Sequence, residues 1–306
     1  MKHIYLIGLL TSTLFLQQIR AQDSSLLKML NDSIALNEKP FFVTGTFKAN
    51  HVVNMQTIEG PGAGSLNLEI QHRFGKLSSG IYDFFGLDIA NWRLGFDYGI
   101  TDRLVVGVGR SSYEKTYDGY IKYKLLRQTA GSQKMPVTVS LLGTISNYTL
   151  DMPEKPYLNA TYRTAYTAQL LLARKFTSWL SAQIVPTYLH YNLVPTANDK
   201  NDVFSLGVGL RAKFTKRMSI NAEYNYLPTG QIVSTKVYNN FSLGWDMETG
   251  GHVFQLVFTN AQSMIETQYI TQTVDQWKNG DIYFGFNVSR NFNLSKKAKS
   301  GASKTK

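Results

Sequence analysis

The sequence alternates between apolar and polar residues with a period of two, in segments of about ten residues. In residues 91–100, NWRLGFDYGI, every second residue from Trp92 is apolar, and the residues between are Asn, Arg, Gly, Asp and Gly. Residues 66–73, 203–214 and 218–226 repeat this division. Because side chains of a strand point alternately to its two faces, each segment predicts a β-strand with one apolar and one polar face.

The length of these segments favours a membrane barrel over a soluble sheet. A half-buried soluble sheet gives the same alternation, but its strands centre on about five or six residues. A tilted strand needs about 9–11 residues to cross a bilayer. Only 17% of the residues are charged, against about 25% in ordinary soluble domains. Aromatic residues also gather near segment ends on the apolar face, as in an interfacial girdle.

Short and long connections alternate along the chain. Outer-membrane barrels join their strands by short turns in the periplasm and by longer external loops, and we expect this orientation here. Pro186 is the one proline inside a predicted strand, and it indicates a bulge or a local break. The predicted short turns are residues 101–102, 129–135, 177–178, 216–217 and 249–250, and the predicted long polar loops are residues 151–161, 192–202, 228–239 and 261–280.

The parity of the strands constrains their number. Counting from residues 91–100, the run at 281–292 is the eleventh strand, and both run towards the periplasm. A closed antiparallel barrel needs an even number of strands, so one further strand is required. Residues 43–53 and 65–75 are both candidates, and the one that is not used lies inside or outside the wall. We predict an all-β fold, a transmembrane antiparallel up-and-down β-barrel of about 12 strands; the range extends to 14 if both candidates enter and residues 82–88 add another.

The ends of the chain are expected to lie outside the barrel. Residues 1–21 have a basic start, an apolar stretch and an Ile-Arg-Ala end, which predicts a signal peptide. Residues 22–40 predict a short periplasmic helix and linker, residues 41–294 the barrel, and residues 295–306 a disordered basic tail. Export without a spanning helix predicts the outer membrane of a Gram-negative bacterium.

The net charge of +11 says little about partners, because much of it lies at the two ends of the chain. The signal segment holds Lys2 and Arg20, and the tail adds five lysines, so the body is nearly balanced. We therefore expect no nucleic-acid partner. The absence of cysteine in the sequence excludes disulfides, thiolate zinc sites and a lipoprotein anchor.

No residue pattern indicates an enzyme. His51, His72, His190 and His252 are isolated from one another, without the spacing that places two metal ligands on one face. Gly107 and Gly109 lie in a strand pattern and not before a helix, which excludes a phosphate loop and favours small residues that let the wall pack inward. We predict no catalytic residue, no metal and no cofactor.

Charged residues on the polar face of the predicted strands are the candidate functional residues, because this face lines the lumen. Their signs nearly cancel. Such charges must be hydrated or paired, so they fit a wet pore and an occluded, ion-paired interior equally. The lumen-lining candidates are Glu69, Arg73, Arg93, Asp97, Lys122, Lys124, Arg211, Lys213, Glu223, Asp246 and Glu248.

Seven stretches resemble an uncharacterised family of outer-membrane β-barrel proteins from Bacteroidota, known as a domain of unknown function. They are TFKANHVVN from Thr46, HRFG from His72, FGLD from Phe85, DYGITDRL from Asp97, GRSS from Gly109, TYDGYIKYKLLRQ from Thr116 and DQWKNGDIYFGFNVSR from Asp275. The resemblance spans nearly the whole chain after the signal segment. It implies an outer-membrane barrel, and it brings no catalytic residue.

Three functions remain open. The first is a narrow passive channel for small polar solutes, with the mixed charges of the lumen setting a weak selectivity. The second is a closed structural or binding barrel that recruits a partner through its outer loops or the periplasmic helix. A hydrolase is the least favoured. The expected partners are outer-membrane lipid and the barrel assembly machinery, which would read the terminal strand at residues 283–292.

Overall fold

The computed structural model describes residues 28–29, 41–131 and 134–294 of the 306-residue chain. The predicted signal peptide, nearly all of the predicted N-terminal helix and the predicted basic tail lie outside the described residues.

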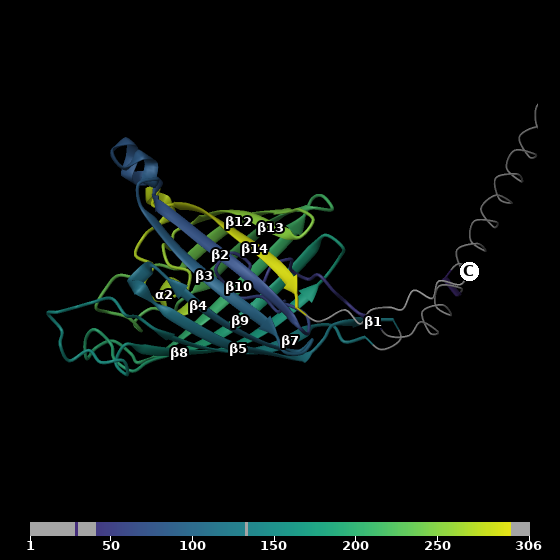
Figure 1. Cartoon of the computed structure of the whole chain (residues 1–306), viewed down its shortest axis with the longest axis horizontal. Helices are drawn as coiled ribbons and strands as arrows, with labels where there is room; N and C mark the ends of the chain where they lie inside the picture. The colour runs from purple at the N-terminus through teal and green to yellow at the C-terminus, as the bar shows by residue number, and fades with distance from the viewer. Residues whose placement is uncertain (1–27, 30–40, 132–133, 295–306) are drawn as a thin grey trace, which may run out of the picture. The chain divides into compact units, whose positions relative to one another are not determined.

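Twelve antiparallel strands form a closed barrel in which each strand pairs with its neighbour in the chain (Figure 1). The last strand pairs with the first through a register that runs from Tyr283–Lys76 to Asn293–Ser65. The predicted fold class and the central estimate of 12 strands are confirmed. The strands are β2 (Ser65–Lys76), β3 (Ala90–Gly99), β4 (Leu104–Ser111), β5 (Tyr117–Leu126), β7 (Thr138–Asn147), β8 (Thr164–Lys175), β9 (Leu180–Tyr191), β10 (Asp202–Lys213), β11 (Met218–Tyr226), β12 (Asn240–Glu248), β13 (His252–Thr259) and β14 (Tyr283–Asn293).

The choice between the two candidate first strands is resolved by β2, which is the segment predicted at 65–75. Residues 82–88 form no strand, because the connection from β2 to β3 contains the 3₁₀-helix η1 (Leu77–Gly86). The 14-stranded alternative is therefore wrong. The strands β1 (Phe41–Phe42) and β6 (Thr129–Ala130) pair in a separate two-stranded sheet that belongs to a different compact unit of the chain.

The outward face of the wall is apolar. Large side chains such as Phe96, Ile121 and Phe204 are 41%, 53% and 58% exposed, although they belong to hydrogen-bonded strands of the barrel. On the same face His72 stacks against Phe286, with 5.0 Å between the ring centroids. A continuous exposed apolar surface of this kind is costly in water and marks contact with lipid. Strand lengths of 8–12 residues agree with a bilayer crossing.

Pro186 leaves the register of β9 unchanged. It pairs with Leu206 of β10 inside an unbroken ladder, so the predicted bulge is absent. On the β8 side the pairing stops after Gln169–Thr187 and resumes at Leu172–Ile184 in the same register. The predicted local break therefore consists of missing pairs only, because proline has no N–H to donate.

Two segments that are not strands fill the inside of the barrel. We call residues 44–60 the luminal hairpin; His51 pairs with Gln56 across it, and its tip from Val52 to Met55 is fully buried. We call residues 261–275 the luminal loop; it contains the short helix α2 (Glu266–Tyr269), whose four residues are all buried. Residues 261–280 were predicted to be a solvated outer loop, which is wrong for the luminal loop.

Glycines on the inward face make room for bulky polar side chains. A Cβ atom at Gly107 would lie 2.1 Å from the Tyr120 ring and 2.7 Å from an Asp97 carboxylate oxygen. At Gly143, on the lipid face, the nearest atom would be 3.9 Å away, which is an ordinary contact.

We therefore expect Gly107→Ala to destabilise the barrel by about 1–3 kcal/mol, the usual cost of overpacking. The unfolding midpoint in urea, followed by the heat-modifiable mobility of the folded barrel on a gel, measures this change. Gly143→Ala is the matched control and should leave the midpoint nearly unchanged. Equal effects of the two substitutions would contradict the packing argument.

Candidate functional site

The luminal hairpin touches strands all around the barrel, which places it inside the lumen. Its partners lie on β2, β5, β9, β11 and β14. Both of its ends lie at the end of the barrel that carries the short turns. Near the first end, Lys175, the last residue of β8, donates to the Thr44 carbonyl at 2.9 Å; beyond the other, the Ala63 amide donates to Asp102 in the β3–β4 turn at 3.2 Å.

The tip of the hairpin is held by one carboxylate. The backbone amides of Val53, Asn54 and Met55 donate to the Glu223 carboxylate on β11 at 3.1, 3.0 and 2.9 Å. Glu223 is 1% exposed. A buried carboxylate is stabilised when several N–H groups donate to it, and these amides in turn need an acceptor because they lie away from water. The carboxylate and the turn therefore satisfy each other.

Amide and guanidinium groups of the wall bind the oxygens of the tip. Arg73 donates to the side-chain oxygens of Asn54 and Asn287, both at 2.8 Å. Asn287 in turn donates to the Val53 carbonyl at 2.9 Å, and Gln255 donates to the Val52 carbonyl at 2.8 Å. Arg73 is fully buried, so its charge is compensated by these oxygens within the barrel and not by water.

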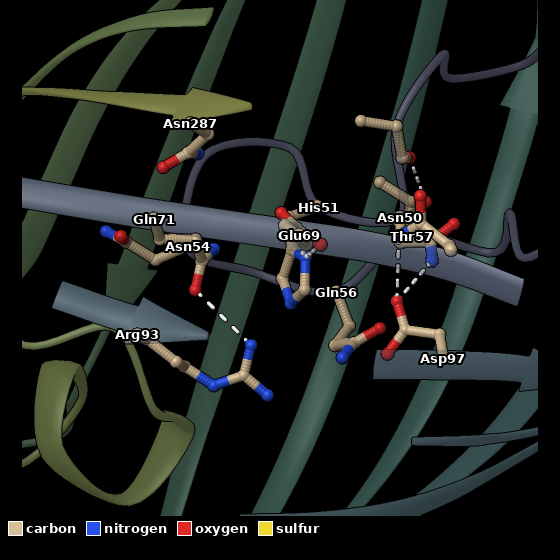
Figure 2. Close-up of polar contacts among 12 residues, drawn as sticks. Asn50, His51, Asn54, Gln56, Thr57, Glu69, Gln71, Arg93, Asp97 and Asn287 are labelled. Atoms are coloured by element: carbon tan, nitrogen blue, oxygen red, sulfur yellow. Dashed lines mark hydrogen bonds and ion pairs between the residues drawn. The ribbon is translucent and has the colours of Figure 1, made fainter. Parts of the chain in front are cut away.

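The first arm of the hairpin, residues 44–51, contacts two carboxylates on neighbouring strands (Figure 2). The imidazole Nδ1 of His51 lies 2.9 Å from Glu69 on β2. The side-chain amide of Asn50 donates to Asp97 on β3 at 2.6 Å, and Asn67 donates to the same oxygen at 3.0 Å. The sequence showed His51 as an isolated histidine; its partner, Glu69, lies 18 residues further along the chain.

The second arm of the hairpin, residues 56–60, binds Lys122 and Gln183 of the wall. The Lys122 ammonium on β5 donates to the side-chain oxygen of Gln56 and to the carbonyls of Thr57 and Glu59, at 3.1, 2.9 and 2.5 Å. Gln183 on β9 donates to the Gln56 carbonyl at 2.7 Å and accepts from the Ile58 amide at 3.1 Å. Backbone groups of an irregular segment thus replace water around a buried lysine.

A smaller polar group lies where the hairpin enters the barrel. Glu248 on β12 accepts from Arg211 at 3.1 Å and lies 2.9 Å from the Lys48 ammonium of the hairpin. Asp246 accepts from Gln255 at 2.6 Å, which links this carboxylate to the tip.

Arg93 pairs with a carboxylate of the wall. Its guanidinium binds Asp118 on β5 with two hydrogen bonds, the Nε–Oδ1 distance being 2.9 Å, and both side chains are 4% exposed. Lys124 and Lys213 are half-buried and lie close to the short turns. Most of the candidate charges therefore contact the hairpin, whereas Arg93 and Asp246 bind wall residues and the two lysines lie near the rim.

The luminal loop closes the opposite end of the barrel. Tyr191 at the end of β9 donates to the Thr267 carbonyl at 2.6 Å, and Ser146 at the end of β7 lies 3.0 Å from the Thr267 hydroxyl. Asp275 pairs with Lys76 at 2.9 Å and also accepts from the Tyr283 hydroxyl. Apolar residues of the loop and the hairpin, including Tyr269 and Met55, belong to one buried cluster with residues of β8, β9 and β10.

A line of polar side chains on β7 and β8 is left without partners by both segments. We call Ser140, Thr144, Thr167 and Gln169 the polar strip. Each points inward and is at most 6% exposed. The three hydroxyls and the Gln169 side-chain carbonyl have no hydrogen-bond partner. Thr144 faces Thr167 directly across the two strands.

The polar strip leads into a cavity of about 460 Å³ at the long-loop end. Ser146 and Ala165, each two residues beyond the strip on its own strand, line this cavity. The β7–β8 loop contributes Tyr148, Tyr157 and Tyr162, and the luminal loop contributes the floor through Thr267 and Gln268. The cavity is thus built by outer loops above and by the luminal loop below.

The sequence carried partial signals for the two luminal segments. The alternation of apolar and polar residues is interrupted at Val52 and Val53, which are adjacent and both apolar. A strand with one apolar face does not allow this. Met264 with Ile265, and Tyr269 with Ile270, place apolar residues in the segment that we predicted to be polar and solvated. Neither signal identifies the wall residues that the segments contact.

Within residues 28–29, 41–131 and 134–294, no group of three or more His, Cys, Asp or Glu side chains could hold a metal ion. In the same part of the chain no helix has the length and apolar character needed to span a membrane.

The closed barrel with its apolar outer face defines a membrane β-barrel protein. Residues 47–292 match the family described as "Membrane bound beta barrel domain (DUF5777)", and the chain belongs to this family. No curated protein matches the sequence.

Solved structures with a similar fold are porins and channels. The KdgM porin is 9% identical with a TM-score of 0.45, covering 74% of this chain and 99% of its own. The NanC porin is 8% identical with a TM-score of 0.46, covering 74% and 98%. An outer membrane channel from Pseudomonas putida F1 is 12% identical with a TM-score of 0.45, covering 76% and 97%.

We expect Glu223→Ala to release the tip of the luminal hairpin, because three buried amides lose their acceptor and each unsatisfied group costs about 1–3 kcal/mol. Hydrogen exchange followed by mass spectrometry should show faster exchange of residues 52–56, while the amides of the wall stay protected. Glu154→Ala, an exposed glutamate of the β7–β8 loop, is the control. Unchanged protection of the tip would show that Glu223 does not hold it.

Proposed function

We propose that the protein is a narrow outer-membrane channel for small polar solutes, closed in this conformation by the luminal hairpin and the luminal loop. The observation that carries the proposal is the polar strip on β7 and β8. It continues the cavity at the long-loop end towards the short-turn end along one side of the lumen.

The energetics of the strip favour a hydrated path. A buried polar group without a partner costs about 1–3 kcal/mol, and the strip collects three unpaired hydroxyls and one unpaired amide oxygen along one pair of strands. Water or a polar solute that passes along these strands would satisfy them. Elsewhere on the inner wall many polar groups are paired with the hairpin, for example Glu223 and Lys122, and the unpaired atoms there, such as Gln71 Nε2 and Asn221 Oδ1, are scattered over separate strands.

The way in which the hairpin is held is compatible with opening. Most of its polar contacts are hydrogen bonds and ion pairs from its backbone and polar side chains to the wall, beside the apolar packing of residues such as Met55. Water can replace each of these bonds when the hairpin leaves, so the net cost of each is only about 0.5–1.5 kcal/mol. Twelve strands lie between the 8 that side chains fill and the 16 that leave an open aqueous channel.

The proposal includes the setting of the protein. Residues 1–21 direct export, the short turns face the periplasm, and the chain comes from a Bacteroidota species, as the resemblance of its sequence motifs implies. Outer-membrane lipid surrounds the wall, the barrel assembly machinery inserts it, and the solutes are small and polar. We assign no chemical step to any residue.

Single-channel recording in planar bilayers tests the proposal. A variant in which short Gly-Ser linkers replace residues 46–58 of the luminal hairpin and residues 262–274 of the luminal loop should conduct steadily, whereas the full-length protein should be silent or open only briefly, because the two segments fill the lumen. Tyr82→Ala, in the exposed helix η1, is the control and should behave like the unaltered protein. A folded barrel that stays silent without its hairpin and loop would overturn the channel.

The path is tested in the same background without the hairpin and the loop. Thr144→Val with Thr167→Val keeps the size of both side chains and removes two hydroxyls of the polar strip, so conductance should fall by about half or more if hydration of this path is required. Ile145→Val, on the lipid face of β7, is the matched control. Unchanged conductance in the double variant would place the path elsewhere in the lumen.

A further inference from the structure

The cavity at the long-loop end has the size and the shape of a small-molecule site. Its volume of about 460 Å³ lies within the range of about 300–1,000 Å³ that is typical of ligand pockets. Outer loops surround it, and the luminal loop closes its base. It is therefore the first place that a solute from the long-loop side would meet.

The buried and half-buried charged groups of the cavity are already occupied by the protein, whereas Lys155 and Lys200, which also line it, are exposed to solvent. The Arg163 guanidinium donates to the carbonyls of Leu150 and Leu158 at 2.5 and 3.1 Å and stacks over the Tyr148 ring. Glu114 accepts from the Gln268 side chain at 3.0 Å. Neither group is a free buried charge that waits for a counter-ion.

Asp199 is occupied in the same way. One of its oxygens accepts from the amides of Val233 and Ser234 at 2.7 and 3.0 Å, and the other accepts from the amide and the hydroxyl of Thr196. Burial opposes the ionisation of this carboxyl, but these hydrogen bonds hold its pKa well below the ordinary value. The carboxylate therefore fixes the loops and leaves no oxygen for a cationic ligand.

Aromatic rings and one unpaired hydrogen-bond acceptor also line the cavity. Tyr148, Tyr157 and Tyr162 line the cavity. The side-chain amide of Gln268 donates to Glu114 and to Thr116, at 3.0 and 2.9 Å, which fixes the orientation of this amide because a carboxylate only accepts. The Gln268 carbonyl oxygen is then left buried and without a partner, although the side chain lines the cavity and is 2% exposed.

A sugar ring matches this set of groups. It presents polarised C–H groups on its faces, which the electron-rich faces of aromatic rings attract, and hydroxyl donors on its rim, one of which could satisfy the Gln268 carbonyl. We propose that the cavity is a binding site for a neutral saccharide of about monosaccharide to disaccharide size, at the outer entrance of the channel. This proposal rests on the proposed function only in placing the site at the entrance of a channel. Saccharide binding itself requires no conduction.

The position of the site also connects it to the closed state. Gln268 belongs to the luminal loop, so a saccharide bound to its carbonyl touches the segment that closes this end of the barrel.

Isothermal titration of the full-length protein with maltose tests the site. The protein is kept in a detergent without a sugar headgroup, because a maltoside detergent would compete for the cavity. We expect saturable binding of maltose and weaker binding of galacturonic acid, since the two lysines that line the cavity, Lys155 and Lys200, are exposed and their charges are screened by water and salt. Absence of saturable maltose binding to the folded barrel, or tighter binding of the acid, would overturn the assignment.

Two variants locate the binding. Tyr157→Ala removes an exposed ring from the cavity, and Gln268→Leu removes the unpaired acceptor; each should weaken maltose binding about fivefold or more. Tyr82→Ala removes another exposed tyrosine, one that does not line the cavity, and it should bind as the unaltered protein does. If Gln268→Leu fails to fold, Tyr157→Ala still decides, and unchanged affinity in that variant sinks the proposal.

The two proposals fail separately. Maltose binding to the full-length protein, together with a barrel that stays silent without its hairpin and loop, would keep the saccharide site and remove the channel. Steady conductance of the variant without the hairpin and the loop, with no maltose binding to the full-length protein, would keep the channel and remove the site.

Discussion

Closure of the β-sheet between β14 and β2 is the constraint on which the rest of the structure depends. In lipid every backbone N–H and C=O group must find its partner within the protein, and the pairing of Asn293 with Ser65 at one end and Tyr283 with Lys76 at the other leaves no open edge. Closure also separates two environments. The outward residues face lipid and are apolar, whereas the inward residues enclose a space that is wide enough to admit polypeptide.

The inside of the barrel then requires partners for many polar groups in a small volume. Buried ions are costly unless they are paired or hydrogen-bonded, and direct pairs between wall residues, such as Arg93 with Asp118, satisfy only some of them. The luminal hairpin supplies partners for many of the others. Its amides neutralise the Glu223 carboxylate, its carbonyls bind Lys122, and Asn54 binds Arg73. An irregular segment suits this role because its backbone groups are not used in a regular ladder.

Some buried polar groups of the lumen have no hydrogen-bond partner even with the hairpin in place. The polar strip on β7 and β8 keeps hydroxyl groups without partners, and the cavity above it ends at the unpaired carbonyl of Gln268. Both features lie on one side of the lumen and join at Ser146. The proposals for a solute path and for a saccharide site therefore rest on one physical argument, that buried polar groups need partners which this conformation does not provide.

The sequence by itself determined the class of fold, a strand number of 12 to 14 and the inward or outward direction of the side chains, because the period of two is a local property of the chain. It also indicated that one of the segments 43–53 and 65–75 is not a wall strand, since a closed antiparallel barrel needs an even number of strands. Only the tertiary structure decided that the first segment turns back inside the barrel and that residues 261–275 enter from the other end. The contact between Met55 and Glu223 spans 168 residues of sequence, and no local pattern encodes which carboxylate binds which amide. Whether the charges of the lumen face water or polypeptide depends on such distant contacts, and therefore only the folded barrel could show it.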